Sequence, residues 1–270
     1  MVNLDDEFGR ELARRVRRPG WKVMGYGFGD SRDAALRVTG SDLVTGPHGV
    51  TFAVTTPWGS ARVASPVLGR HNASNLLATL AVLLAGGISL RRAVATLTHL
   101  RSVPGRMQRL GGGPKPLVVV DYAHTPDALE QTLLALRELT AGDPSPVTRH
   151  PSRLTCVFGC GGERDRGKRP QMGRIAARLA DRVIVTSDNP RGEDPQHIID
   201  DILEGVRGVE DELAIIADRG SAVRYAVVSA RRGDIVLVAG KGHEDYQLIG
   251  GVKHAYNDAA EARRALAHPR

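Results

Sequence analysis

The chain has 270 residues, which is enough for one or two domains with a sizeable buried core. Its 41% hydrophobic and 25% charged residues are typical of a water-soluble enzyme, and the longest apolar stretch, residues 76–88, is too short to span a bilayer. The net charge of +7 is compatible with nucleic-acid binding, but only 4% of residues are aromatic, so bases would find few stacking surfaces and a solvated arginine-rich surface is favoured.

Two further features limit the classes of protein to consider. The first 20 residues contain no apolar signal region, so we expect a cytoplasmic protein. The two cysteines, Cys156 and Cys160, are too few for a zinc site, and a disulfide is not expected in a reducing compartment. We therefore expect small, buried, unbridged thiols.

The first hundred residues predict a mixture of strands and helices. Residues 1–13 predict the end of a strand, an acidic turn and a helix, and residues 35–67 alternate in polarity as antiparallel strands do. Residues 69–87 predict a helix of about 13 residues that ends at a glycine pair. Ser89 is expected to cap a second helix over residues 90–100.

A domain boundary is expected near residues 103–105, and a regular alternation of strands and helices follows it. Continuous β-branched runs are typical of buried parallel strands, so we predict an open α/β sheet of four to six strands with right-handed crossovers. Thr125 and Pro126 should begin a helix that buries Leu133. The apolar runs are residues 117–120, 154–158, 183–186 and 235–239.

Each apolar run leads directly into a polar turn that contains glycine or proline. The four turns read DYAHTPD, GCGGERDRGKRP, SDNPRGEDP and GKGHEDYQ. Ligands of parallel sheets bind beyond the carboxyl ends of the strands, so the four turns predict one site. Its Asp, Arg, Lys, His and Glu content suits anionic and zwitterionic substrates.

The second turn satisfies the phosphate-loop spacing G-x-x-x-x-G-K at residues 162–168. A phosphate loop is nevertheless disfavoured, because bulky charged residues intervene and Arg169 replaces the hydroxyl residue that binds magnesium. Arg164 could instead hold a carboxylate through two hydrogen bonds. Asp165 and Arg166 are expected to pair with each other.

The third and fourth turns have the side chains needed for an amino-acid head group. Asp188 can accept from an ammonium, Asn189 can donate or accept, and Arg191 can hold a carboxylate. The alternative is a local Asx-turn with an exposed arginine. Residues 240–247 crowd a lysine, a histidine and a glutamate, which favours a functional group, although a histidine near a strand end is more often structural.

Two other segments suggest nucleotide contacts. His71 offers a stacking surface, and Asn72 and Asn75 offer amides that could read a purine edge. The alternative is ordinary helix capping by Asn72. Asp121, at the tip of a buried strand, could hold a ribose hydroxyl or a metal-bound water. The sequence has no serine-triad elbow, zinc signature or Rossmann G-x-G-x-x-G.

Seven segments together resemble the Mur ligase family, and DNPR resembles the signature of its diaminopimelate-adding members. The resemblance implies a Rossmann-like C-terminal sheet domain over 104–270, which binds the amino acid. Residues 1–103 would then be the remnant of a P-loop-type ATPase domain. In chain order the segments are VNLDDEFG, GRHNASNLLA, VPGRMQRL, DYAHTPDALE, VFGCGGERDRGKRPQMG, SDNPRGEDP and GKGHEDYQ.

The resemblance also implies an activity: ATP-dependent addition of meso-diaminopimelate to UDP-MurNAc-L-Ala-D-Glu in peptidoglycan synthesis, with Mg²⁺. No residue present is assigned a catalytic role. The implied adenine contacts are His71, Asn72 and Asn75, and the implied ribose and phosphate contacts are Arg106 and Asp121. The implied diaminopimelate pocket consists of Arg164, Asp188, Asn189, Arg191, Gly240 and Glu244.

The chain departs from the family in lacking the UDP-sugar domain and a GTNGKT-like phosphate loop. We therefore expect an N-terminally truncated portion that is inactive alone, with most magnesium ligands in the absent part. Either the start of the chain is placed too late, the gene is broken, or the missing part comes from another chain. The rival interpretations are a non-catalytic amino-acid-binding module and a related ligase of the folylpolyglutamate or cyanophycin synthetase type. Neither a nucleic-acid nor a membrane partner is expected.

Overall fold

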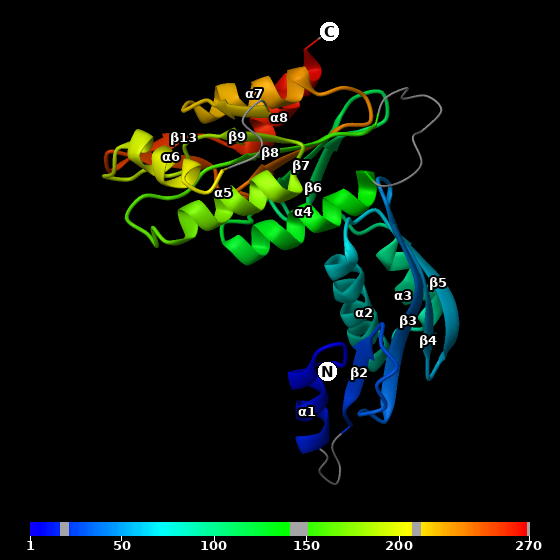
Figure 1. Cartoon of the computed structure of the whole chain (residues 1–270). Helices are drawn as coiled ribbons and strands as arrows, with labels where there is room; N and C mark the ends of the chain where they lie inside the picture. The colour runs from blue at the N-terminus through cyan, green and yellow to red at the C-terminus, as the bar shows by residue number, and fades with distance from the viewer. Residues whose placement is uncertain (17–21, 141–150, 207–211, 269–270) are drawn as a thin grey trace. The chain divides into compact units, whose positions relative to one another are not determined.

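The computed structural model describes residues 1–16, 22–140, 151–206 and 212–268, which divide into two compact units, Met1–Arg101 and Ser102–Arg270 (Figure 1). Each unit has a sheet and a buried core of its own. No helix within these ranges is long and apolar enough to cross a membrane.

The first unit contains a five-stranded sheet in the order β1-β2-β3-β4-β5. The first three strands are parallel, whereas β3, β4 and β5 are antiparallel, as the alternation of polarity predicts. The expected strand end, acidic turn and helix are also present, since α1 (Glu7–Arg15) follows β1 and is capped by the Asp6 side chain. The strands are β1 (Val2–Asn3), β2 (Met24–Gly27), β3 (Leu36–Gly46), β4 (Gly49–Thr56) and β5 (Gly59–Ser65).

Two helices complete the first unit, α2 (Arg70–Ala85) and α3 (Leu90–Leu97). α2 is 16 residues long rather than about 13, because it begins directly after Gly69. α3 ends at Leu97 rather than Leu100, and Ser89 occupies its N-cap position without a side-chain capping bond. The buried leucines of α2 belong to the same apolar cluster as Phe52 and Val54 of β4.

The second unit has a six-stranded sheet in the order β10-β9-β8-β11-β7-β6, which confirms the predicted open α/β sheet. Only β6 is antiparallel to its neighbour. β7, β8 and β11 are buried along their whole length, as β-branched runs in a covered parallel sheet should be. The strands are β6 (Gln108–Gly111), β7 (Leu117–Asp121), β8 (Leu154–Phe158), β9 (Arg182–Val185), β10 (Leu213–Ile215) and β11 (Ile235–Ala239).

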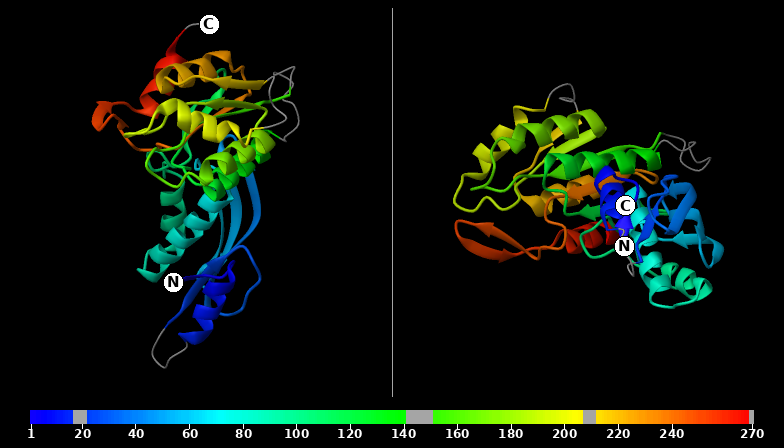
Figure 2. Two further views of the ribbon diagram at one scale, coloured as in Figure 1. Left: turned by 60° about the vertical axis from the view of Figure 1, so that its left-hand side comes forward. Right: turned by 90° about the horizontal axis from the view of Figure 1, so that it is seen from below.

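Helices cover both faces of this sheet. α7 and α8 pack on one face, and α4 and α5 lie on the other with α6 beside α5 (Figures 1 and 2). Thr125 caps α4 through its hydroxyl, as predicted, and Leu133 is fully buried. A two-stranded hairpin, β12 (Tyr246–Ile249) and β13 (Val252–Ala255), follows β11. The helices are α4 (Pro126–Thr140), α5 (Lys168–Leu179), α6 (Pro195–Leu203), α7 (Arg219–Ser229) and α8 (Asp258–Ala267).

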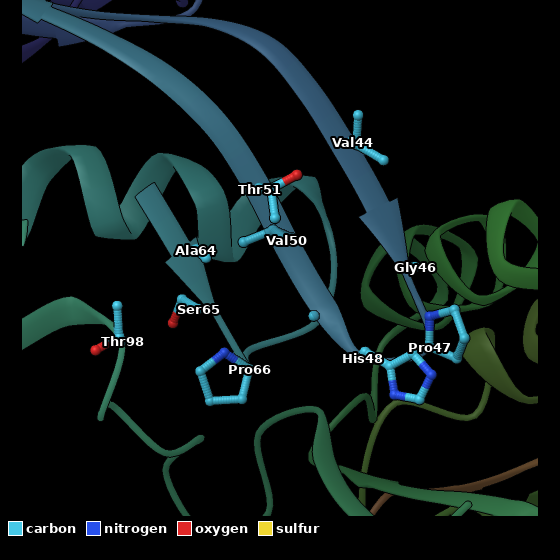
Figure 3. A pocket seen from close by; sticks show the side chains of 11 residues that line it. Val44, Gly46, Pro47, His48, Val50, Thr51, Ala64, Ser65, Pro66 and Thr98 are labelled. Atoms are coloured by element: carbon cyan, nitrogen blue, oxygen red, sulfur yellow. The ribbon is translucent and has the colours of Figure 1, made fainter. Parts of the chain in front are cut away.

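A cavity of about 480 Å³ lies in the first unit, between the β3–β4 turn and the end of β5 (Figure 3). His48, Ser65 and Pro66 are among the residues that line it. None of the predicted site residues lines it.

Two adjacent leucines of α4 test the packing of the second unit. Leu133 is fully buried, whereas Leu134 is 42% exposed. Leu133→Ala should lower the free energy of unfolding by about 2–5 kcal/mol, because it removes buried methyl groups and leaves a cavity. Leu134→Ala should change it by less than about 0.5 kcal/mol. Urea unfolding of the two variants measures the difference, and equal losses would show that α4 does not pack as described.

Candidate functional site

The four polar turns that the sequence singled out lie at one edge of the second sheet. β7, β8, β9 and β11 are parallel, so the turns that follow them all leave from the carboxyl edge. The segment before β6 reaches the same edge, because a side chain at Gly105 would lie 2.1 Å from the backbone nitrogen of His243. Gly105 also has a φ of +69°, so this close approach requires glycine.

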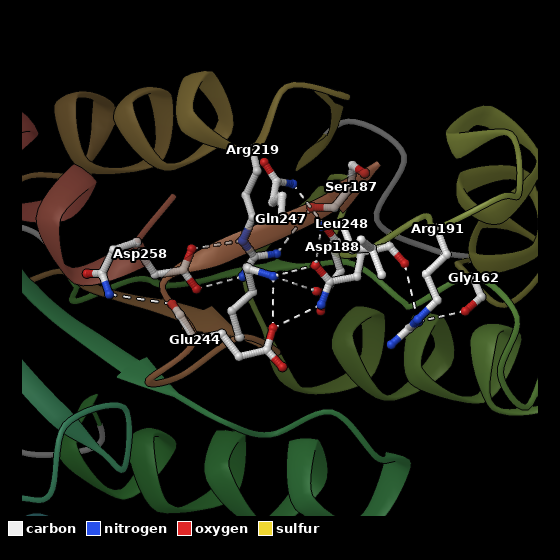
Figure 4. Close-up of polar contacts among 12 residues, drawn as sticks. Gly162, Ser187, Asp188, Arg191, Arg219, Glu244, Gln247, Leu248 and Asp258 are labelled. Carbon is white, nitrogen blue, oxygen red and sulfur yellow. Dashed lines mark hydrogen bonds and ion pairs between the residues drawn. The ribbon is translucent and has the colours of Figure 1, made fainter. Parts of the chain in front are cut away.

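Lys241 is the centre of the polar network at this edge (Figure 4). Its side chain is fully buried, and Nζ donates to Asn189 Oδ1 at 2.8 Å, Glu244 Oε2 at 3.0 Å and Asp188 Oδ1 at 3.3 Å. Asn189 Nδ2 also donates to Glu244 Oε2 at 2.9 Å. One cation thus lies between two carboxylates, which leaves the cluster with a net negative charge that would attract an ammonium group.

Glu244 is held in its ionised form. Burial would raise the pKa of its carboxyl, but the hydrogen bonds from Lys241 and Asn189 outweigh burial, and the pKa is lowered. Both of these hydrogen bonds involve Oε2. Oε1 accepts neither of them.

Gly240 has to be glycine at its position. Its φ is +115°, and a side chain there would lie 2.7 Å from Asp188 Oδ2. The turn after β11 can therefore pass close to the Asp188 carboxylate only with glycine at position 240.

The hairpin β12–β13 fixes the turn that carries Asn189 and Arg191. Leu248 donates its backbone N–H to Asn189 Oδ1 at 2.9 Å, and its carbonyl accepts from the Arg191 backbone N–H at 2.9 Å. Gly250 then donates its N–H to the Arg191 carbonyl at 2.7 Å. Arg191 has a φ of +55° and is half-buried, with Nη1 donating to the carbonyl of Gly162 at 2.7 Å. It is therefore not the exposed arginine of a local Asx-turn.

A buried arginine, Arg169, holds the turn that carries Arg164. Arg169 is fully buried and contacts Glu193 and Asp201, at 2.9 Å and 2.8 Å, and it also donates to the carbonyl of Gly161 at 3.2 Å. The hydrogen bonds from Arg169 are the main cause that lowers the pKa of Glu193, to about 2. Arg164 itself is exposed to solvent.

The expected pairing of Asp165 with Arg166 was wrong. Arg166 pairs with Asp201 at 3.2 Å, and Asp165 accepts from the backbone N–H of Gly167 at 2.9 Å. The arginine reaches Asp201 because α6 packs against α5, a contact that local sequence does not reveal. The N–H of Gly162 donates to the carbonyl of Asn189, so this turn is not an open cradle for a phosphate.

Of the expected nucleotide contacts, Arg106 and Asp121 lie in the second unit. Asp121 is buried, and its carboxylate accepts from the backbone N–H groups of Met107 at 2.7 Å and Ala123 at 2.9 Å. Asp121 therefore joins the segment before β6 to the turn after β7. The guanidinium of Arg106 is exposed and lies 4.6 Å from the centre of the Tyr122 ring.

The other three expected nucleotide contacts lie in the first unit, at the start of α2. His71 and Asn75 are exposed, and Asn75 donates to Asn72 Oδ1 at 3.3 Å. The alternative that Asn72 caps the helix was wrong, because the N-cap residue is Gly69 and Asn72 donates back to the carbonyl of Leu68 at 2.8 Å. The six expected amino-acid contacts are all in the second unit, whereas the five nucleotide contacts are divided between the two units.

Cys156 and Cys160 are unbridged and buried, as expected, and burial raises the pKa of each to about 12. Across the four described ranges, no three His, Cys, Asp or Glu side chains come together in a way that could hold a metal ion.

Sequence reasoning missed three residues that support the site. Gln247 is buried and donates to the carbonyl of Asp188 at 2.8 Å. Arg219 and Asp258 form a fully buried ion pair directly behind the site (Figure 4). Both lie at the first position of a helix outside the four turns. The available signal was Arg219 itself, because a cation at a helix N-terminus is unfavourable without a partner.

Comparison with known proteins gives two matching family models. The Mur ligase glutamate ligase domain matches residues 105–242, and the Mur ligase middle domain matches residues 1–83. A relative from Chromobacterium violaceum, UDP-N-acetylmuramoyl-L-alanyl-D-glutamate–2,6-diaminopimelate ligase, is 48% identical over 98% of this chain and 51% of its own length. The enzyme of the same name from Neisseria meningitidis serogroup B is 46% identical, again over 98% and 51%.

A solved structure with that name is also similar. It has a TM-score of 0.70 and 39% identity, and the match covers 98% of this chain and 52% of the other. The chain therefore spans about half the length of the curated relatives and the solved structure that it matches.

Lys241→Met should lower the free energy of unfolding by about 3–5 kcal/mol, because two partly buried carboxylates lose their shared cation. Lys253→Met is a matched control, since Lys253 also lies over the Tyr246 ring but is exposed. The control should lose less than about 1 kcal/mol. Chemical denaturation at neutral pH measures both values, and similar losses would mean that Lys241 is not the centre of the network.

Glu193→Gln should make the free energy of unfolding depend less on pH between pH 4.5 and about 2. The pKa of Glu193 is lowered from 4.5 to about 2 in the folded protein, so its contribution is complete above pH 4.5 and is lost as the pH falls toward 2. The free energy of unfolding of the parent protein should therefore fall more steeply over this interval than that of the variant. Denaturant unfolding between these pH values tests this, and parallel curves would contradict it.

Proposed function

The chain belongs to the Mur ligase family, and we propose that its second unit binds meso-diaminopimelate for ATP-dependent ligation to UDP-N-acetylmuramoyl-L-alanyl-D-glutamate. The observation that carries this proposal is the arrangement around Lys241. Two carboxylates share one buried cation at one end of the network, and Arg191 lies at the other end (Figure 4). The names of the relatives support the same substrate.

The charges of the network suit the charges of this amino acid. Diaminopimelate carries two ammonium and two carboxylate groups, whereas lysine lacks the second carboxylate. We assign an ammonium of the ligand to Asp188 and Glu244, where the net charge is negative. We assign a carboxylate to Arg191 and Arg164, because a guanidinium can donate two parallel hydrogen bonds to it.

We propose that these residues bind and orient the incoming amine. Correct orientation of two reactants removes much of the entropic cost of a bimolecular reaction. The fixed backbone of Arg191 and the shared cation at Lys241 keep the pocket in one arrangement before the ligand arrives. ATP, when bound, would supply the phosphoryl group that activates the carboxylate of the nucleotide substrate.

The residues proposed to contact the nucleotide are assigned less specifically than those of the amino-acid pocket. Arg106 fits a phosphate contact because its guanidinium is exposed and supported by the Tyr122 ring. Asp121 fits a ribose contact, since a carboxylate oxygen can accept more than one hydrogen bond. His71, Asn72 and Asn75 are proposed for adenine. Within the four described ranges no metal cluster is present, so Mg²⁺ is assigned no residue.

Titration calorimetry of the 270-residue chain tests the proposed substrate directly. Meso-diaminopimelate should bind more tightly than L-lysine or L-glutamate. Tighter binding of glutamate would instead favour a ligase of the folylpolyglutamate type. Absence of binding by all three amino acids would contradict the proposal.

Arg191→Ala should reduce that preference. Loss of a charge-assisted contact costs about 1.5–3 kcal/mol, so diaminopimelate affinity should fall by roughly one to two decades while lysine affinity changes little. Arg182→Ala is the control, because Arg182 is also half-buried but lies over Tyr225 at the start of β9. Equal losses of diaminopimelate and lysine affinity in Arg191→Ala would mean that Arg191 is not a specificity residue.

A further inference from the structure

The two turns that meet at Lys241 come from strands that are not neighbours. Asp188 and Asn189 follow β9, whereas Gly240 and Lys241 follow β11, and β8 lies between these strands. Adjacent strands are about 4.8 Å apart, so the two turns leave the sheet roughly 10 Å from each other. The hydrogen bonds of the sheet tie each strand to β8 and do not fix one turn against the other.

Arg219 contacts both turns from behind. It is the first residue of α7, and its side chain is fully buried. Nη2 donates to the carbonyl of Ala239 at 2.8 Å, and Nη1 donates to the carbonyl of Ser187 at 3.4 Å. These carbonyls belong to the residues directly before Gly240 and Asp188, so one planar guanidinium spans the ends of β9 and β11.

Asp258 fixes the orientation of that guanidinium. Its two carboxylate oxygens accept from Nε and Nη2 of Arg219, both at 2.8 Å. Asp258 is also fully buried and begins α8, where a negative charge is favourable. Burial opposes the charge on Arg219, but Asp258 outweighs it and the pKa of the guanidinium is raised. The guanidinium therefore keeps its charge.

Stability alone does not account for this arrangement. A buried ion pair contributes little net stability, because desolvation of both charges offsets their attraction. Arg219 also stands at a helix N-terminus, where a cation is disfavoured. What a guanidinium adds is geometry, since its five donors lie in one plane and reach four acceptor oxygens of three residues at once.

We propose that Arg219 is a positioning residue of the amino-acid site, which fixes the turn after β9 against the turn after β11 so that Asp188 and Lys241 meet in the arrangement that receives the ligand. This proposal rests on the proposed function for the identity of the ligand, diaminopimelate. It extends that function because Arg219 acts through the two turns and does not touch the ligand.

Arg219→Lys separates positioning from charge. Lysine keeps the positive charge and one contact with Asp258, but a single ammonium cannot hold both carboxylate oxygens and two carbonyls. Amide hydrogen exchange reports on the turns, because Ser187 donates its N–H to the carbonyl of Ala217 and Gly240 donates to that of Asp121. Both amides should exchange about tenfold faster or more in the variant.

Arg137→Lys is a matched control. Arg137 likewise donates to both oxygens of an aspartate, Asp181, at 2.6 and 2.7 Å, and to a main-chain carbonyl, that of Leu179, at 2.8 Å. This arrangement lies at the amino edge of the sheet, where Asp181 also accepts from the N–H of Leu154. Arg137→Lys should speed exchange at Leu154 and leave both site turns unchanged.

Calorimetry with meso-diaminopimelate gives the second readout. Affinity should fall about tenfold or more in Arg219→Lys and by less than about twofold in Arg137→Lys. Faster exchange in the two site turns together with weaker binding supports the proposal. Unchanged exchange at Ser187 and Gly240, or unchanged affinity in Arg219→Lys, overturns it.

Two further outcomes also decide the question. Asp258→Asn replaces Arg219→Lys if that variant does not fold, since it keeps the guanidinium but releases its orientation, and the same two changes are expected. If the parent chain binds no diaminopimelate, the proposed function fails. The exchange comparison then still decides whether Arg219 fixes the two turns.

Discussion

The candidate site depends on one buried ammonium group. Lys241 Nζ is shared by Asp188, Asn189 and Glu244, and no other described cation contacts all three. Because Asn189 also accepts from Leu248, the same contacts extend to the β12–β13 hairpin and through it to Arg191. An ion in a dry site requires partners with fixed geometry. The contacts of Lys241 therefore join the turns after β9 and β11 and the hairpin into one network.

Stability and geometry come from different parts of the second unit. The buried strands and the apolar faces of the covering helices form the core, in which Val118, Val157 and Val236 lie beneath α7 and α8. Burial of such side chains is favourable whatever the details of the edge. The polar network contributes little net stability, because desolvation of its charges offsets their attraction, but it specifies one arrangement of the turns. A parallel sheet suits this division because it carries all its carboxyl ends to one side.

The sequence predicted the parts of this site that follow from local patterns. The β-branched runs located β7, β8, β9 and β11 within one residue at either end, and Thr125 marked the start of α4 correctly. Local sequence patterns did not predict the contacts that depend on an element distant in the sequence. Arg166 pairs with Asp201 from another helix, and the partner of Arg219 lies 39 residues away. Asn72 resembled a cap, but the chain places Gly69 there.

The central claim is that three turns of the second unit form one site for meso-diaminopimelate. The most direct test is a titration of the isotopically labelled 270-residue chain followed by amide chemical shifts. Our account predicts that the shifts that change at saturation belong to residues 161–164, 187–191 and 240–244, with residues 1–101 unaffected. Changes concentrated elsewhere, or no change at saturating ligand, would contradict it.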